Sequence, residues 1–311
     1  MKAVSRITFF DESGEKFFGE GPARLLRGID ETGSLRAAAM SMDMAYTKAL
    51  KLMKHAESAL GFALIARTTG GKTGGGSVLT PEGKQWLRQY EAYRDACIKA
   101  NQELYRQYFP KLGCVIMASG LGKRFGGNKL MADFCGSPMI QRALDVTQGL
   151  FTHRVVVTRH EQIAGLCREQ NVDVVLHDLP HRSDTVRLGL QALGDLDGCM
   201  FLPGDQPLLR RETVAMLVEN WKANPNSIVR PACDGSEGSP VLFPAWTFPE
   251  LLDLPEGKGG GVVICAHPRE VFCVSVADPF ELADADTPET MELLQHNGIR
   301  RKKYDPIAGE F

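Results

Sequence analysis

Short apolar runs recur through the second half of the chain, each bounded by polar or glycine-rich segments. They stand at 114–117, 154–158, 172–175 and 198–202. Between them, apolar residues follow helical spacing, most clearly over 162–170 and 183–193. Strands that alternate with helices predict an α/β fold with a doubly wound, mostly parallel sheet. Ligands then bind beyond the carboxyl ends of the strands.

Helical spacing dominates the first 60 residues instead. After an expected short strand at 5–9, Gly21 and Pro22 begin a helix that stops at Gly33. Ser34 is the expected N-cap of a short helix over 34–42. Asp43 is the expected N-cap of a third helix over 44–60. The third helix offers a core face opposite a basic face, which is typical of a helix-turn-helix. The expected core residues of this helix are Ala45, Leu50, Met53 and Leu60.

A hairpin is expected to follow the third helix. Residues 64–67 and 78–79 read as its strands, and a glycine-rich basic tip joins them. Together with the three helices, this hairpin predicts a winged helix-turn-helix domain over residues 1–79.

One long helix is expected between the two halves. Thr80 is an N-cap, Pro81 suits the first helical position, and the helical pattern continues to about Phe109, before Pro110. A helix of this length spans ~40 Å, longer than one small domain needs, so we expect residues 80–110 to pair two subunits into a homodimer. The predicted remainder is an α/β domain over 111–299 and a C-terminal tail over 300–311. An apolar stripe at helical spacing marks the pairing face: Trp86, Tyr90, Tyr93, Cys97, Ala100, Leu104 and Tyr108.

Composition narrows the class of protein. No apolar run approaches the ~20 residues that span a membrane, and residues 1–10 lack the core of a signal peptide, so we expect a cytoplasmic protein without a membrane partner. The eight cysteines are spread singly, without zinc spacing. Residues 1–110 hold 16 Lys and Arg against 12 Asp and Glu, and the remainder holds 20 against 26. The basic first part permits nucleic-acid binding without demonstrating it.

A loop of small and basic residues follows the strand at 114–117. Its glycines leave backbone N–H groups free to approach a ligand, and Lys123, Arg124 and Lys129 add positive charge, so the loop suits a polyphosphate. It has neither the Gly-Lys-Ser/Thr sequence of a Walker loop nor the spacing of a dinucleotide fingerprint. The alternative from this stretch alone is an ordinary surface loop of an α/β domain.

Carboxylates stand where such a sheet would present them. Asp205 follows the strand at 198–202, and Asp284 and Asp286 lie in an acidic segment just before an expected helix. Mg²⁺ prefers one or two carboxylates together with substrate phosphates, so Asp205 is a candidate ligand. Asp286 could cap the expected helix.

Several of these segments resemble the motifs of MobA/MocA-like nucleotidyltransferases. The sequence SGLGKRFGGNKL, followed by FCGSPMI, resembles the pattern A-A-G-x-G-x-R-M-G-x-x-K with its later G-x-P-L-I. GDQP at 204–207 and DADTPE at 284–289 resemble two further motifs of the family. Ser119 replaces the usual Ala or Gly, and Phe125 replaces Met, without loss of a charge or a required glycine.

The resemblance implies roles for individual residues. The implied catalytic residues are Arg124, Lys129 and Asp205. The implied Mg²⁺ ligands are Asp205 and Asp286, with Asp284 as substitute for Asp286, and a capping role of Asp286 is compatible with this. The implied nucleotide-binding residues are Ala118, Ser119, Gly120, Gly122, Lys123, Ser183 and Asp184. Looser matches imply an acceptor site with Gly238, Pro240 and Lys258, where the acid of the family's corresponding segment is missing.

The first part of the chain resembles the DNA-binding domain of ModE-type and LysR-type regulators. The segments LLRGIDETGSLRAAA and ARTTGGKTGGGSVLTPEG, with the third helix between them, carry this likeness. Ala45 stands where that family often has Ser, so one contact to the DNA backbone is absent. A winged helix can also serve dimerisation or protein binding, and that alternative stays open. The implied DNA contacts are Thr47, Lys48 and Lys51 in the major groove and Arg67 and Lys72 near phosphates.

The two resemblances together imply a Mg²⁺-dependent enzyme of molybdenum cofactor biosynthesis fused to a DNA-binding domain. Its reaction would move a nucleotide from an NTP to the phosphate of molybdopterin and release pyrophosphate. The pair Lys129-Leu130 resembles the sequence at this point in the cytidylyl-transferring branch of the family. This resemblance favours CTP over GTP as the substrate. Two alternatives remain: a transcription regulator whose transferase-like domain senses a nucleotide or cofactor, and transfer to another phosphorylated acceptor such as a sugar phosphate.

Overall fold

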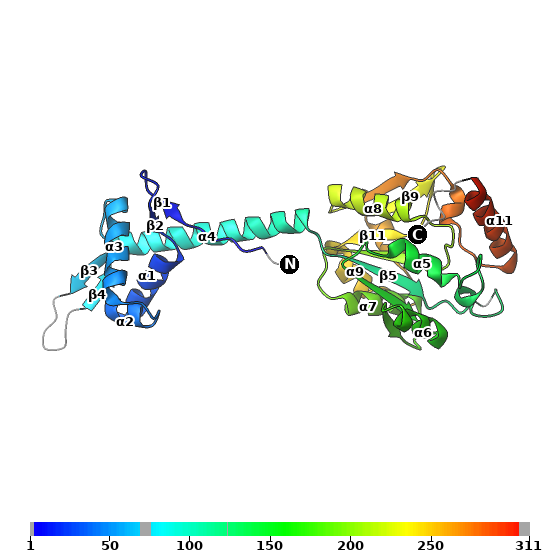
Figure 1. The fold of residues 1–311 in the computed structure, drawn as a ribbon, viewed down its shortest axis with the longest axis horizontal. Coiled ribbons are helices and arrows are strands. Elements are labelled where there is room, and N and C mark those ends of the chain that lie inside the picture. Colours follow the sequence, from blue (N-terminus) through cyan, green and yellow to red (C-terminus); the bar gives the residue numbers. More distant parts are fainter. Residues whose placement is uncertain (1–2, 69–75, 123, 305–311) are drawn as a thin grey trace. The chain divides into compact units, whose positions relative to one another are not determined.

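The computed structural model describes the backbone of residues 3–68, 76–122 and 124–304, with the side chains in these ranges except those of Thr68 and 300–304. The chain divides into two compact units, Met1–Tyr105 and Arg106–Phe311 (Figure 1). One core of buried apolar side chains lies in the first unit, and two lie in the second.

Three helices with tight turns form the body of the first unit. They are α1 (Glu20–Thr32), α2 (Leu35–Met40) and α3 (Tyr46–Leu60). Gly33 ends α1 in the left-handed conformation, with φ 67°, and the Ser34 hydroxyl accepts a hydrogen bond from the Ala37 N–H at 3.3 Å. Both caps confirm the sequence prediction. Helices α1 and α2 pack closely at Gly28, because a Cβ there would lie 2.8 Å from the Cβ of Ala38.

The predicted wing is present beside α3. Strands β3 (Ile65–Thr68) and β4 (Gly76–Leu79) pair antiparallel, with Ile65 opposite Leu79. The Glu57 carboxylate fastens the hairpin to α3, because it accepts hydrogen bonds from the N–H groups of Leu64 at 2.8 Å and Ile65 at 3.1 Å.

Three expectations near the N-terminus are wrong. The strand expected at 5–9 is displaced: β1 (Phe9–Phe10) pairs with β2 (Lys16–Phe18), which the sequence did not predict. Asp43 does not cap α3, because it sits in a turn with a left-handed φ of 50°. The helix begins after Ala45, which is exposed and lies outside the core. Asp tolerates left-handed backbone better than most residues, so it serves the turn.

Helix α4 (Pro81–Tyr108) begins as predicted, with the Thr80 hydroxyl accepting a hydrogen bond from the Gly83 N–H at 2.8 Å. The start of its apolar stripe is packed, and the Tyr90 ring lies 5.0 Å from that of Phe18. Farther along, most of the stripe is exposed, with Tyr93 at 53% and Tyr108 at 73%, and Cys97 is half-buried.

The second unit is organised on an eight-stranded sheet with the order β10-β9-β11-β8-β5-β6-β7, and β12 pairs with β9. The strands β8, β5, β6 and β7 are parallel, as predicted, whereas β11 runs antiparallel between β8 and β9. The strands are β5 (Leu112–Ala118), β6 (His153–Thr158), β7 (Asp173–Leu176), β8 (Gly198–Pro203), β9 (Ile228–Cys233), β10 (Ser236–Glu237), β11 (Val241–Pro244) and β12 (Val271–Ser275).

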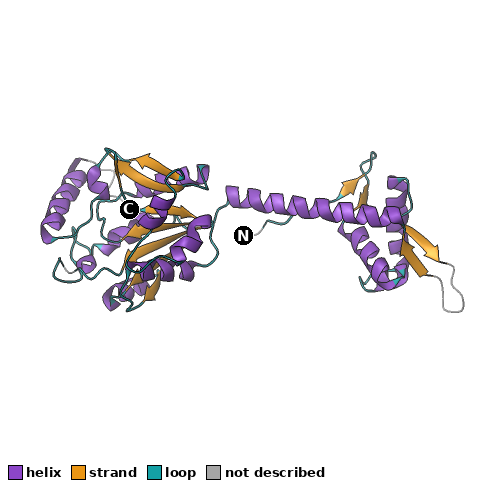
Figure 2. Ribbon diagram, turned by 180° about the vertical axis from the view of Figure 1, so that it is seen from behind, coloured by secondary structure: helices purple, strands orange, loops and turns teal. Residues whose placement is uncertain are grey.

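Helices cover both faces of this sheet, which confirms the doubly wound α/β prediction (Figures 1 and 2). Successive side chains of β5 point to opposite faces, so Ile116 joins the core under α5, α6 and α8, and Val115 joins the core under α7, α9 and α10. These helices are α5 (Ile140–Thr147), α6 (Glu161–Glu169), α7 (Arg182–Leu193), α8 (Arg211–Ala223), α9 (Phe248–Leu252) and α10 (Gly261–Ala266). The remaining elements are η1 (Lys129–Met131), η2 (Ala245–Thr247), η3 (Pro279–Leu282) and α11 (Pro288–Tyr304). Within the described ranges, no helix has both the length and the apolar character that crossing a bilayer requires.

Candidate active site

A buried lysine lies between two carboxylates at the carboxyl end of the sheet. The Lys129 Nζ is 2.5 Å from the Asp205 Oδ2 and 2.9 Å from the Asp286 Oδ1. Lys129 belongs to the short turn η1, Asp205 follows β8, and Asp286 precedes α11. The Ala285 N–H donates a hydrogen bond to the Asp205 carbonyl at 2.9 Å, which holds the two acidic segments side by side. Three segments far apart in sequence thus converge on one ammonium group.

The charges of this cluster shift the pKa values of its members. Burial alone lowers the pKa of Lys129, but hydrogen bonds and charges from Asp205 and Asp286 outweigh it and raise that pKa. The hydrogen bond from Lys129 lowers the pKa of Asp286, to which the Arg124 charge adds, with an Nη2–Oδ2 distance of 3.3 Å. Loss of hydration raises the pKa of Asp284, and the charge of Asp205 raises it further. Lys129 and Asp286 are therefore held in their charged forms.

The cluster opens into a cavity of about 730 Å³, here called the acidic cavity. Three of the expected nucleotide-binding residues line it: Ser119, Gly120 and Gly122. Ala118 ends β5 and is buried, and its carbonyl accepts a hydrogen bond from the Thr158 hydroxyl at 2.9 Å. Lys123 lies outside the described residues. The remaining lining residues are Met117, Leu121, Arg124, Lys129, Leu130, Arg159, Pro180, His181, Arg182, Thr185, Pro203, Asp205, Ser239, Asp284 and Asp286.

Only glycine suits position 122. Its φ is +57°, and a Cβ there would lie 2.1 Å from the carbonyl oxygen of Gly127. The Gly122 carbonyl accepts hydrogen bonds from the N–H groups of Phe125 at 2.9 Å and Gly126 at 3.1 Å. The loop therefore folds back on itself in a tight turn and brings Arg124 and Lys129 to the same cavity.

The first turn of α7 lines the acidic cavity with different residues from those expected. The Asp184 carboxylate accepts hydrogen bonds from the His181 N–H at 3.0 Å and from the Arg187 guanidinium at 2.9 Å. Ser183 is buried, and neither it nor Asp184 lines the acidic cavity. Their neighbours Arg182 and Thr185 do line it. Which side chains of a helix face the cavity depends on where its first turn begins, and sequence predicts that start poorly.

A second cavity of about 600 Å³, here called the apolar cavity, adjoins the first and shares Met117, Arg182, Pro203 and Ser239 with it. Lys258, one of the expected acceptor-binding residues, lines it. Gly238 and Pro240 flank Ser239 and do not line the cavity themselves. Sequence reasoning missed Arg182, although it is a cation at the wall of both cavities. The other lining residues are Val186, Phe201, Arg230, Val241, Phe243, Leu251, Gly259, Gly260, Gly261, Val262, Ile264 and Cys265.

The acid cluster suits Mg²⁺. Asp205 and Asp286 present carboxylate oxygens to one ammonium group, and burial together with the charge of Asp205 raises the pKa of Asp284. Excess negative charge at this point would be relieved by a cation, and carboxylate oxygens are the ligands that Mg²⁺ prefers.

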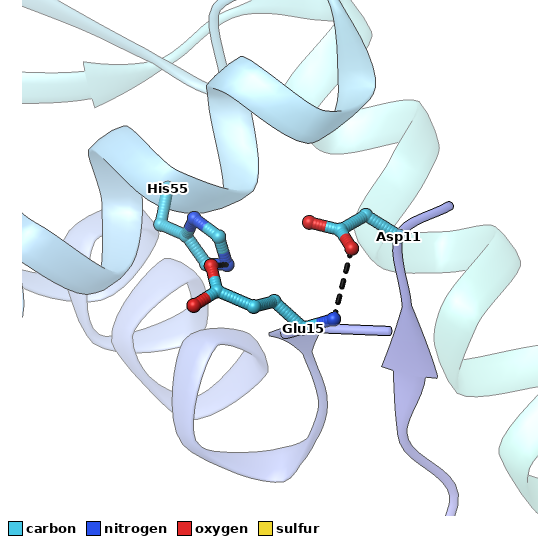
Figure 3. Close-up of side chains that lie close together, drawn as sticks. All are labelled: Asp11, Glu15 and His55. Carbon is cyan, nitrogen blue, oxygen red and sulfur yellow. Dashed lines mark hydrogen bonds and ion pairs between the residues drawn. The ribbon is translucent and has the colours of Figure 1, made fainter. Parts of the chain in front are cut away.

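Asp11, Glu15 and His55 form another group of metal-ligand types, with atoms within 4.8 Å of one another (Figure 3). The Asp11 Oδ1 already accepts hydrogen bonds from the N–H groups of Ser13 at 3.0 Å and Glu15 at 2.9 Å. The Glu15 carboxylate faces His55, with an Oε2–Nε2 distance of 3.8 Å. A capped turn with a loose ion pair accounts for this group, and we assign no metal to it.

The expected DNA contacts lie on the outer face of α3 and on the wing. Thr47, Lys48 and Lys51 are exposed, opposite the buried Ala49 and Met53. Arg67 is exposed on β3, and Lys72 lies outside the described residues. The basic face of α3 is therefore available to a partner.

Comparisons with known proteins agree with this two-part arrangement. Residues 114–271, just over half of the chain, match the MobA-like NTP transferase domain. Residues 23–84 match the bacterial regulatory helix-turn-helix proteins of the lysR family.

Similar proteins include enzymes that transfer nucleotides. A probable molybdenum cofactor guanylyltransferase of Aquifex aeolicus is 28% identical over 110 residues, which are 35% of this chain and 53% of that relative. A 3-deoxy-manno-octulosonate cytidylyltransferase of Hahella chejuensis is 25% identical over 185 residues, or 57% of this chain and 70% of the relative. The chain thus spans about half of the Aquifex relative. The crystal structure of Rv0371c from Mycobacterium tuberculosis has a TM-score of 0.55 at 20% identity, covers 60% of this chain and 98% of that one, and shows the fold alone.

Proposed function

Because the chain belongs to the MobA-like NTP transferase family, we propose that its second unit is a Mg²⁺-dependent nucleotidyltransferase that moves CMP from CTP to the phosphate of molybdopterin. The observation that carries the proposal is the triad in which Lys129 bridges Asp205 and Asp286 at the wall of the acidic cavity. A cation flanked by two acids, beside a glycine-rich loop, suits a triphosphate and the charge that develops when it is cleaved.

The chemistry that this site would perform is an in-line displacement. An oxygen of the acceptor phosphate attacks the α-phosphorus of the NTP, the bond from that phosphorus to the bridging oxygen breaks, and pyrophosphate leaves. The attacking oxygen is already anionic, so no general base is required. Arg124 and Lys129 would hold the phosphates, and catalysis would consist of positioning and charge neutralisation.

Asp205 and Asp286 are the residues that would hold Mg²⁺, with Asp284 beside them. Bound there, the ion would neutralise charge on the phosphates. The role of this chain is to hold the two carboxylates in place, through the ammonium group of Lys129 and the Ala285–Asp205 backbone hydrogen bond, and to keep Asp286 ionised.

The apolar cavity is the candidate acceptor site. Its wall is largely apolar, from Phe201 to Phe243, and Arg182 and Lys258 supply positive charge. Such a site fits an acceptor with an uncharged ring system and a terminal phosphate. The name of the Aquifex relative supports the molybdenum cofactor as acceptor, and the Lys129-Leu130 pair is our reason for favouring CTP over GTP.

The first unit would bind DNA through Thr47, Lys48, Lys51 and Arg67, as its match to the lysR helix-turn-helix family supports. The exposed stripe of α4 is the proposed pairing surface of a homodimer. Both activities would operate in the cytoplasm, where NTP and chromosomal DNA are present.

A second candidate function follows from the same helix-turn-helix match. The chain could be a transcription regulator whose transferase-like unit senses a nucleotide or cofactor. Pyrophosphate release with Mg²⁺ and molybdopterin, measured side by side with CTP, GTP and ATP, separates the two. Turnover with a preference for CTP supports the transferase. Nucleotide binding without turnover of any nucleotide refutes the transferase and leaves the sensor.

A further inference from the structure

Ser119 stands where the related pattern has Ala or Gly, and its hydroxyl has two polar neighbours at the rim of the acidic cavity. The Ser119 Oγ lies 3.0 Å from the Val157 carbonyl oxygen and 2.8 Å from the His177 Nε2. Ser119 follows β5, Val157 belongs to β6, and His177 follows β7, so three neighbouring strand ends meet at this hydroxyl. The next residue is also held, because the His160 Nε2 lies 2.9 Å from the Gly120 carbonyl oxygen.

Counting protons fixes the direction of these hydrogen bonds. A carbonyl oxygen can only accept, so the single hydroxyl proton of Ser119 goes to Val157. The His177 Nε2 must then carry a proton and donate it to the Ser119 Oγ. Burial lowers the pKa of His177, and the nearby charge of Arg159 lowers it further, so the ring is neutral and its Nδ1 carries no proton.

The surroundings of the Nδ1 agree with this tautomer. Among the described residues, this atom is buried and has no hydrogen-bond partner. In proteins, a buried N–H group without a partner is rarer than a buried acceptor without one. The state in which the Nδ1 carries no proton therefore has the lower free energy. The Ser119 hydroxyl therefore donates its proton within the protein. One lone pair of its oxygen remains available to accept a hydrogen bond from a ligand in the acidic cavity, which Ser119 lines.

An oxygen that can only accept a hydrogen bond selects among the parts of a nucleotide. Phosphate oxygens at neutral pH carry almost no protons to donate, so the Ser119 Oγ does not favour them. We propose that Ser119 is a nucleotide-selecting residue whose hydroxyl oxygen accepts a hydrogen bond from an N–H or O–H group of the nucleoside. This inference deepens the proposed function and rests on nucleotide binding in the acidic cavity. The nucleoside then lies at the ends of β5 to β7, and the phosphates lie toward Lys129.

The test compares binding of four probes to the full-length wild type and to Ser119→Ala by calorimetry: CTP, UTP, 2′-deoxy-CTP and tripolyphosphate. We expect the variant to lose about three- to tenfold in affinity for CTP, the range for one net hydrogen bond, and to bind tripolyphosphate unchanged. If the base amino group is the donor, UTP affinity stays unchanged. If the ribose 2′-hydroxyl is the donor, the variant loses affinity for CTP and UTP to the same extent, and its affinity for 2′-deoxy-CTP stays unchanged.

Matched variants distinguish loss of the contact between Ser119 and the nucleoside from a general loss of structure or ligand binding. Ser137→Ala removes a hydroxyl from another loop of the same unit, outside the acidic cavity, and should leave every affinity unchanged. His177→Gln keeps an N–H donor for Ser119 and should preserve the affinity for CTP, whereas His177→Phe should lower it and leave tripolyphosphate binding unchanged, which would identify His177 as a positioning residue.

Three outcomes would overturn the inference. Equal affinities of wild type and Ser119→Ala for CTP would remove the nucleoside contact, and an equal loss for CTP and tripolyphosphate would place Ser119 at the phosphates. A wild type that binds none of the nucleotides would overturn both this inference and the proposed function.

Discussion

Replacing Lys129 by Met tests the centre of the site most directly. Methionine has a similar length and no charge, so Lys129→Met removes the ammonium group that lies 2.5 Å from Asp205 and 2.9 Å from Asp286. The two carboxylates then remain close together without a shared cation. We expect a less stable second unit and loss of nucleotidyl transfer.

The stability cost follows from the burial of the cluster. The Lys129 side chain is 10% exposed, Asp205 is 21% exposed and Asp286 is 40% exposed. Breaking a fully buried ion pair costs ~3–5 kcal/mol, whereas an exposed pair is worth ~0–1 kcal/mol. This cluster lies between those limits, so about 2 kcal/mol is expected, which lowers the unfolding temperature of a unit of this size by about 4–8 °C.

The pH dependence of that cost has a definite sign. The pKa of Asp286 is lowered in the folded protein, so its contribution to stability is present above its unfolded pKa and is lost as pH falls through the folded value. The pKa of Lys129 is raised, so its contribution is present below its unfolded pKa and is lost as pH rises through the folded value. The difference between wild type and Lys129→Met should therefore be largest between about pH 5 and 9 and shrink outside that window.

Calorimetric unfolding of the full chain, in EDTA and then with excess Mg²⁺, measures these effects. Mg²⁺ should stabilise Lys129→Met more than the wild type, because it replaces the lost positive charge. Lys258→Met is the matched control: it removes an exposed lysine from the apolar cavity and should change stability by less than about 0.5 kcal/mol. If Lys129→Met unfolds at the wild-type temperature at pH 7 in EDTA, the charge argument for the triad is refuted.

Three further variants test other parts of the molecule. Asp205→Asn should keep the fold and lower Mg²⁺-dependent pyrophosphate release at least ~10²-fold; unchanged release would exclude Asp205 as a metal ligand. Lys48→Ala combined with Lys51→Ala should weaken DNA binding and flatten its dependence on salt, as followed by titration at several salt concentrations, and an unchanged salt slope would place the contacts elsewhere. Gly83→Ala should destabilise the first unit by about 1–3 kcal/mol in denaturant unfolding, because the added Cβ would lie 2.2 Å from the Leu64 carbonyl oxygen; full stability would mean that α4 can shift away from that oxygen.

The central strands could be predicted from the sequence because their signal is local. Each is a short apolar run ended by glycine or a polar residue, and the observed β5, β6, β7 and β8 contain or overlap the predicted runs. Strand β11 is also a short apolar run, but its place in the sheet has no local signal. It lies between β8 and β9 because Leu242 pairs with Met200 on one side and with Val229 on the other. Apolar runs show that a segment is buried but not which strand it joins.

The misplaced start of α3 has a different cause, because two local rules competed. Aspartate is favoured both as an N-cap and in left-handed turns, and Asp43 takes the second role with φ 50°. The chain between α2 and α3 needs that turn, so the helix starts later, at Tyr46. Local preference alone could not rank the two roles.

Lys129 shows how far residue types carry a site prediction and where geometry is needed. As a loop cation next to glycines it was predicted to meet a triphosphate, and the sequence contained no sign that it is buried in a short turn between two acids. Both observations fit one mechanism. The triad holds Lys129 charged and fixes its position before a ligand arrives, and a lysine that is already desolvated and oriented has less to lose when a phosphate approaches. Arg124 lies 3.3 Å from Asp286 but is 75% exposed, so it remains hydrated until a ligand binds. Of the two cations, Lys129 should therefore contribute mainly to the rate of transfer, and Arg124 mainly to the capture of the nucleotide.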